Sequence, residues 1–546
     1  MKKVFNIYSL CIVLIASLFS ALYLRNIFFN IEDISLITAL ETDVGSIMTS
    51  IQDLFKTPYY SMFNGYHSKF YGWSYYTLNF IILIPVKLAT YFISFLYNFN
   101  YDMPFFFTVR LNHFLLGLAS SIMIFKVLTI KSFFKKKINV AVAFCASLTF
   151  LTIPVAPSLF VFVHPEILGI FLTLVAIFLL LKFIGTLNLN YYYYSVIALS
   201  IAIMTKQPFI FTSIPIMFSF AYFYIKSLDT PCIKFIKSYE MWVIFKKTTI
   251  LSVCVAFVIH PYLFFRLPFF FEIQTQLLNT FSGNISYLNS LLNWTQLFYG
   301  FNPGGAFNLI FVTSFYLLPA TFIISSIIFL KQKNNYSLLP VMNSLAILLF
   351  VLILAYGNRT FFFPTYISPI YIFLIFNLVF AFTFPVNLIK NIIFKIIFSL
   401  FVGLIIFLQA TLNIINIIDE SKSRISTNSL PHRTFEFITN NIKVGDKIVY
   451  DHFVAIPAPY MKSAGHYWHG YGTDLIETFN PKYVIFNAEY PTKNIYTDRL
   501  KKYVSDHNMK LIETLGAPNQ KWMIVNPDSN AHTLYSSSKV FIYIKP

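Results

Sequence analysis

A series of long apolar runs constrains the fold of this chain more than any other feature. About 12 runs reach the roughly 20 residues that a helix needs to cross the hydrocarbon core of a bilayer. With a mean hydropathy of +0.66 and only 11% charged residues, a soluble protein of 546 residues could not bury this much apolar surface. The sequence therefore predicts an all-α polytopic membrane bundle of about 11–13 transmembrane helices. The runs cover residues 4–24, 74–97, 104–130, 138–159, 165–184, 190–206, 207–226, 242–266, 306–330, 336–356, 362–384 and 391–418.

The net charge of +18 does not indicate a nucleic-acid partner, because Lys and Arg gather at the ends of the apolar runs. This placement is typical of the positive-inside rule. The four cysteines show no metal-ligand spacing, so the sequence predicts neither a disulfide framework nor a zinc site. The first run follows Lys2-Lys3 and lacks a small-residue cleavage motif, so we expect a retained helix.

The basic clusters also predict which segments lie outside the cytoplasm. They place the first loop, 25–73, the loop 268–304 and the tail after about residue 420 on the outer side. A chain that starts inside and ends outside must cross the membrane an odd number of times. The 12 apolar runs are even in number, so they conflict with this requirement. Either one run between 74 and 165 does not cross, or the cluster Lys135-Lys136-Lys137 lies outside against the charge rule.

The tail differs in character from the rest of the chain. From 427 to 546, short strand-like segments alternate with helix-like ones, which indicates a small α/β domain. The sequence thus predicts a transmembrane domain over 1–420 and a soluble periplasmic domain over 427–546. No Gly-rich phosphate loop is present in the tail.

Glu41 and Asp43 lie in the loop after the first apolar run, directly before an amphipathic segment. After Asp43, apolar residues recur at i, i+3, i+4, i+7, i+10 and i+11, which predicts an amphipathic helix lying in the membrane interface. A carboxylate at the N-terminus of such a helix tends to stay ionised. Asp43 is therefore either a candidate for chemistry or a plain helix N-cap.

Further polar residues interrupt apolar sequence on the predicted outer side. His164 and Glu166 flank Pro165, where they either start a helix or face a cavity; they could bind a metal, but two ligands do not make a site. Lys206 either snorkels to the membrane surface or binds an anion such as a phosphate. Arg266 and Arg359 are similar outer cations, and the group together indicates a phosphate-carrying substrate.

Aromatic residues crowd the segment before the second apolar run. They begin with Tyr59 and Tyr60, include Tyr66 beside His67, and continue to Tyr76. They form either an interfacial belt or a stacking surface for a sugar or an isoprenoid chain.

In this order, the motifs resemble those of the GT-C superfamily of membrane glycosyltransferases, in the bacterial branch related to protein O-mannosyltransferases and aminoarabinose transferases. The matching segments are Asp43-Val44-Gly45, Tyr66-His67 to Tyr76, Arg110, His164-Pro165-Glu166, Thr205-Lys206 and Arg359 to Pro369. In this resemblance, Arg110 corresponds to an arginine that opens the next helix. Val44 departs from the family pattern, which often has a second acid at this position, and the usual prolines are absent at Ser68-Lys69.

The resemblance implies an enzyme of the bacterial inner membrane that transfers a sugar, with inversion, from a polyprenyl-phosphate donor. The acceptor would be an envelope glycan, lipid A or a protein outside the cytoplasm. Asp43 would act as the general base, with Glu41 as the nearby substitute, and Lys206 with Arg266 or Arg359 would hold the lipid phosphate. His164 or Glu166 would orient the donor sugar or hold a divalent metal, and no other cofactor is expected.

Two other functions fit the same residues. A flippase or transporter of lipid-linked sugars would use the cations but no base, and would show repeat symmetry, which the sequence lacks. An O-antigen ligase or polymerase would share the substrate and a large outer loop.

Overall fold

The structure is a computed structural model of the whole chain. The residues that it describes are 6–28, 36, 44–58, 72–96, 102–130, 140–152, 159–160, 163–228, 238–266, 268, 323, 326–327, 338–356, 368–388, 391–425, 430–450, 454–466, 473–487, 495–516, 524–525, 532–533 and 539–546. Arg359, Asp43, Glu41, Tyr66 and His67 lie outside these residues.

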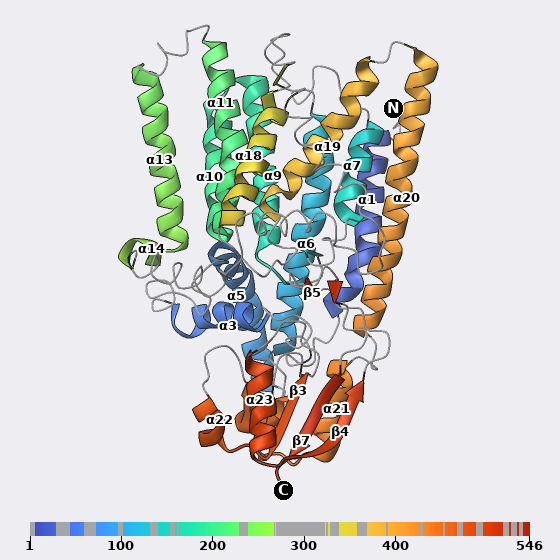
Figure 1. The fold of residues 1–546 in the computed structure, drawn as a ribbon. Helices are drawn as coiled ribbons and strands as arrows, with labels where there is room; N and C mark the ends of the chain where they lie inside the picture. Colours follow the sequence, from blue (N-terminus) through green and yellow to red (C-terminus); the bar gives the residue numbers. More distant parts are fainter. Residues whose placement is uncertain are drawn as a thin grey trace.

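Long helices stand side by side and form a bundle, with the C-terminal part of the chain beyond one end of it (Figure 1). Within the described part of the chain, six helical segments are long and apolar enough to cross a membrane. The predicted all-α membrane bundle is confirmed, and each expected run except 306–330 coincides with described helix. The bundle helices are α1 (Ile7–Tyr23), α6 (Asp102–Thr129), α7 (Val140–Thr152), α9 (Glu166–Thr186), α10 (Leu189–Thr205), α11 (Ser213–Ser227), α13 (Tyr239–Ile259), α18 (Leu338–Tyr356), α19 (Ser368–Leu388) and α20 (Ile392–Ile425).

Helices α9 and α10 form an antiparallel pair at the centre of the bundle. Leu187, in the left-handed conformation, and Asn188, the N-cap of α10, make the turn between them. At the other end α10 stops at Thr205, Lys206 is extended, and Pro208 lies in the 3₁₀ helix η2 (Gln207–Thr212). A proline has no N–H to donate to the helix and its ring clashes with the carbonyl four residues before it, so α10 cannot continue through Pro208 and ends before it. The turn brings Lys206 to the level at which α9 begins.

The helix predicted after Asp43 is present as α3 (Val44–Lys56) and lies across the end of the bundle (Figure 1). Its apolar face, which includes Ile47 and Ile51, is buried in the core of the protein. The Phe55 ring lies 4.6 Å from that of Phe80, between centroids, on α5 (Trp73–Leu96). The apolar face of α3 therefore packs on protein.

Helix α5 begins beside the end of α10. The Gly72 amide donates to the Thr205 carbonyl at 2.7 Å, and the Ser74 hydroxyl donates to the Ile201 carbonyl at 2.8 Å. From there α5 runs past α3 and away from α9 and α10 (Figure 1). By length and composition, Trp73–Ile93 is among the six described segments that could cross a membrane, so both topological alternatives stay open.

The C-terminal part forms a separate α/β unit, and the predicted fold class is confirmed there. Its five-stranded sheet has the order β2-β1-β3-β7-β4, with β2, β1 and β3 parallel and β7 antiparallel to both of its neighbours. Residues of α21 share a buried cluster with one face of the sheet, and residues of α22 and α23 share a cluster with the other. The elements are α21 (Leu430–Asn441), β1 (Ile448–Tyr450), β2 (Ala464–His466), α22 (Thr473–Phe479), β3 (Tyr483–Asn487), α23 (Ile495–Asp506), β4 (Lys510–Gly516) and β7 (Lys539–Ile544); β5 (Ile524–Val525) and β6 (His532–Thr533) pair outside this sheet.

One contact joins the first loop to the C-terminal unit. Leu36, in the predicted outer loop 25–73, packs against Ala455 and the partly buried Phe435. The two segments that the charge pattern assigns to the same side of the membrane therefore meet.

The approach of η2 to α9 requires a glycine. A Cβ on Gly169 would lie 2.4 Å from the Phe209 ring, whereas a Cβ on Gly185, in the same helix, would meet nothing within 4 Å. We expect Gly169→Ala to lower the stability of the detergent-solubilised protein by about 1–3 kcal/mol through overpacking. Gly185→Ala should leave stability unchanged or raise it by up to about 1 kcal/mol. Thermal unfolding of both variants tests this, and equal midpoints would contradict the close packing.

Candidate functional site

The site centres on an ion pair between α9 and the residue that follows α10. The Lys206 ammonium donates to Oε1 of Glu166, and both side chains are at least nine-tenths buried. Glu166 is the first residue of α9, where the helix dipole stabilises a carboxylate. Charges in an apolar bundle are costly unless they are paired, so this pair is a strong candidate for function.

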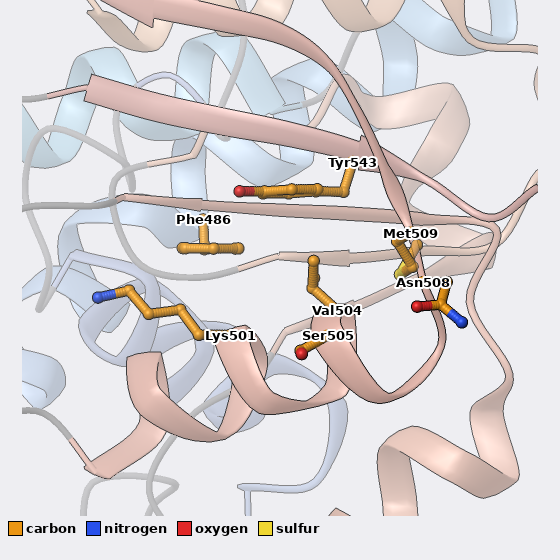
Figure 2. A pocket seen from close by; sticks show the side chains of 7 residues that line it. All are labelled: Phe486, Lys501, Val504, Ser505, Asn508, Met509 and Tyr543. Atoms are coloured by element: carbon orange, nitrogen blue, oxygen red, sulfur yellow. The ribbon is translucent and has the colours of Figure 1, made fainter.

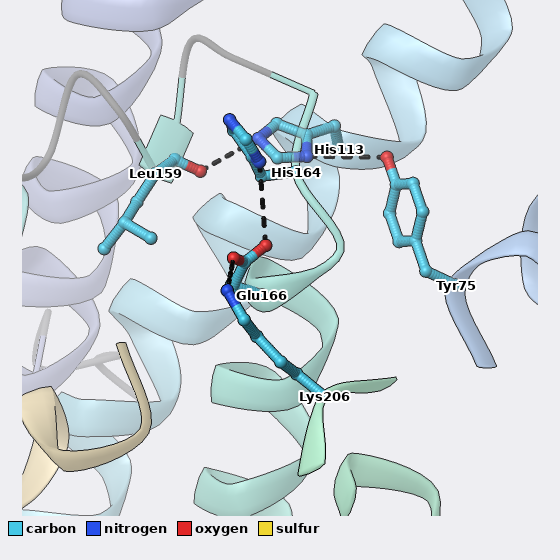
Figure 3. Close-up of polar contacts among 6 residues, drawn as sticks. All are labelled: Tyr75, His113, Leu159, His164, Glu166 and Lys206. Carbon is cyan, nitrogen blue, oxygen red and sulfur yellow. Dashed lines mark hydrogen bonds and ion pairs between the residues drawn. The ribbon is translucent and has the colours of Figure 1, made fainter. Parts of the chain in front are cut away.

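His164 adds a second basic group to the same carboxylate. Its Nδ1 lies 3.7 Å from Oε2 of Glu166, and its side chain is 16% exposed (Figure 3). Pro165 caps α9 between the two residues and fixes their spacing. Glu166 therefore faces Lys206 with one oxygen and His164 with the other. The predicted members His164, Glu166 and Lys206 thus come together in one cluster.

A second histidine, which the sequence reading did not include, lies beside this cluster. His113 of α6 is buried, and its Nε2 is 2.9 Å from the Leu159 carbonyl (Figure 3). Its Nδ1 is 3.5 Å from the hydroxyl of Tyr75 in the first turn of α5. A proton on Nε2 would let the ring donate to Leu159 and accept from Tyr75. Tyr75 belongs to the predicted aromatic segment and is buried, so this member of the segment does not form a surface belt.

An aromatic stack extends the site toward α13. The Trp73 and His260 ring centroids are 4.1 Å apart, and the His260 and Tyr262 rings stack at 5.2 Å. Trp73 follows Gly72, whose amide donates to the Thr205 carbonyl, so this row of three rings begins next to Lys206. His260 is fully buried.

Two arginines of the resemblance lie apart from the ion pair. Arg110 donates to the Asn26 carbonyl at 2.8 Å. It is in the third turn of α6, which begins at Asp102, so it does not open the helix as the resemblance implied. Arg266 follows the short helix α14 (Tyr262–Phe265) and is exposed.

A metal site at this cluster stays a prediction. Among the residues that the structure describes, no group of three or more His, Cys, Asp or Glu side chains is placed to hold a metal ion. His164 and Glu166 supply two ligand types at most, and a divalent metal would need further ligands.

The ion pair should contribute measurably to the free energy of unfolding. Glu166→Gln leaves the Lys206 charge buried without its carboxylate, and we expect a loss of about 3–5 kcal/mol. Lys206→Gln should cost a similar amount, and the double variant should cost clearly less than the sum of the two. Thermal unfolding in detergent measures all three. Additive losses would show that the two side chains do not interact.

No protein-family model matches the sequence, and no curated protein matches it. Solved structures resemble it over most of its length. One is the oligosaccharyltransferase of Archaeoglobus fulgidus tethered to an acceptor peptide, at 14% identity and a TM-score of 0.48, covering 96% of this chain and 74% of that protein. Another is ArnT of Cupriavidus metallidurans bound to undecaprenyl phosphate, at 12% identity and a TM-score of 0.44, covering 96% of this chain and 97% of that protein.

Proposed function

We propose that this protein is an inverting glycosyltransferase that moves a sugar from a polyprenyl-phosphate donor to an envelope glycan, a lipid such as lipid A or a protein. The reaction takes place on the outer side of the bacterial inner membrane. The observation that carries the proposal is the buried Glu166–Lys206 pair with His164 beside it. The pair lies at the end of the bundle toward which α3 and the C-terminal unit are placed (Figure 1).

Lys206 is the group that meets the donor phosphate. A lysine ammonium has three N–H groups, so it can hold both a carboxylate and a phosphate oxygen. Glu166 orients this ammonium and His164, and the buried setting strengthens their effect on charge that develops on the leaving phosphate. Arg266 and Arg359 are the additional cations of the donor site.

Asp43 is the general base in this proposal. It takes the proton of the acceptor hydroxyl or amine as that group attacks the anomeric carbon. The bond from the anomeric carbon to the phosphate oxygen breaks, and its electron pair leaves with the polyprenyl phosphate. Attack opposite the leaving group inverts the anomeric centre. Glu41 is the nearby substitute for Asp43, and Tyr66 and His67 contact the sugar.

In this proposal the membrane domain binds the lipid donor and the C-terminal domain lies on the acceptor side. Residues 1–420 form the catalytic membrane domain, with the loop 268–304 as a lid over the donor. Residues 427–546 form a periplasmic domain on the acceptor side. Membrane lipid surrounds the bundle, and nucleic acid has no role.

A transfer assay with a labelled polyprenyl-phosphate sugar tests the roles. We expect Asp43→Asn to lower the transfer rate at least about 100-fold, as for loss of a general base, while donor binding is kept. Lys206→Gln should weaken donor binding and transfer together. Lys182→Gln is the matched control, because Lys182 is exposed near the opposite end of α9.

Two outcomes would count against the proposal. Normal transfer by Asp43→Asn would remove Asp43 as the base. Movement of the labelled lipid between leaflets without any sugar transfer would establish the flippase instead. An O-antigen ligase or polymerase would transfer or extend a polymer rather than a single sugar, so the size of the product separates that alternative.

A further inference from the structure

The C-terminal unit carries an open pocket of about 480 Å³ between α23 and the sheet (Figure 2). Its apolar part is formed by Phe486 of β3, Val504 of α23 and Met509. The Phe486 ring stacks in parallel on the Tyr543 ring of β7, with centroids 5.6 Å apart and planes 5° from parallel. The two rings therefore contact each other within the wall of the pocket.

Polar side chains surround this apolar part. Lys501, Ser505 and Asn508 recur at i, i+4 and i+7, and all three line the pocket and are exposed. The Lys501 ammonium and the Tyr543 hydroxyl point to the same end of the pocket, and Ser505 and Asn508 lie toward the other end (Figure 2). No carboxylate is among the described side chains that line it. The pocket is thus cationic at one end, neutral and polar at the other, and apolar between them.

We propose that this pocket binds an acidic sugar unit. Its carboxylate or phosphate would accept from Lys501 and Tyr543, its hydroxyls would bond to Ser505 and Asn508, and its C–H face would lie on Val504. The volume is in the range of small-ligand sites. The polar lining excludes a lipid tail, which would leave these groups without partners.

The position of the pocket in the molecule indicates which part of the acceptor it binds. The C-terminal unit lies beyond the end of the bundle that holds Lys206 (Figure 1), so its ligand is a part of the acceptor other than the reacting group. The pocket then selects an extended, acidic acceptor glycan. This last step rests on the proposed function, whereas the binding of an acidic sugar does not.

Saturation-transfer NMR on the detergent-solubilised full chain tests the binding with methyl glucuronoside and the uncharged methyl glucoside. We expect the glucuronoside to bind and the glucoside to bind about tenfold more weakly, because it lacks the charge-assisted hydrogen bond. Lys501→Gln should weaken glucuronoside binding about tenfold. Lys502→Gln is the matched control, since Lys502 carries the same charge, is also exposed and does not line the pocket.

Equal glucuronoside binding by the two lysine variants, or equal binding of the two sugars by the natural chain, would overturn the proposal. Tyr543→Phe, which keeps the ring and removes the hydroxyl, should also weaken glucuronoside binding, and an unchanged affinity would remove Tyr543 from the site. Both exposed lysine variants should keep the unfolding midpoint of the natural chain.

A transfer assay separates this inference from the proposed function. With an acidic acceptor glycan, Lys501→Gln should raise the acceptor KM about tenfold and leave kcat unchanged. If the natural chain binds glucuronoside but transfers no sugar, the proposed function fails and the pocket stands. If transfer proceeds and Lys501→Gln changes neither binding nor KM, the pocket fails and the proposed function stands.

Discussion

The buried pair between Glu166 and Lys206 is the constraint on which the arrangement of this end of the bundle depends. Two opposite charges in an apolar interior are tolerated only when they meet, so α9 must begin where α10 ends. Pro208 makes α10 stop, the extended Lys206 turns its side chain to α9, and Gly169 lets η2 approach closely enough. The neighbouring carbonyl of Thr205 then receives the Gly72 amide, at a positive φ of 90° that glycine adopts freely. The position of α5 thereby follows from the geometry of the pair.

The described residues on either side of Asp43 contact different parts of the molecule. Seven residues before Asp43, Leu36 packs against the C-terminal unit through Ala455. Directly after Asp43, α3 begins, and α3 packs on α5, whose preceding Gly72 amide donates to the Thr205 carbonyl. The contacts of Leu36 and of α3 therefore link the C-terminal unit and the membrane bundle to the two sides of this loop.

The sequence predicts the helices well because the apolar runs that let a helix cross a membrane are a property of composition and length. It also predicts α3, since the period of its apolar residues is visible in the chain. The sequence predicts that His164, Glu166 and Lys206 lie on the same, outer side of the membrane. It does not predict their contact, because 40 residues separate Lys206 from Glu166. His113 and His260 carry no periodic signal and become visible only when helices pack.

Two kinds of carboxylate can be distinguished at this end of the bundle. Both oxygens of Glu166 have a partner: one accepts from Lys206 and the other faces His164. The Glu166 side chain is 1% exposed. Protonation of Glu166 would remove the negative charge that pairs with Lys206 in the apolar interior. Glu166 is therefore better suited to orient Lys206 than to take the proton of the acceptor. A general base needs access to the acceptor. Because Glu166 is buried and paired, the proposed mechanism assigns the proton transfer to Asp43 and not to Glu166.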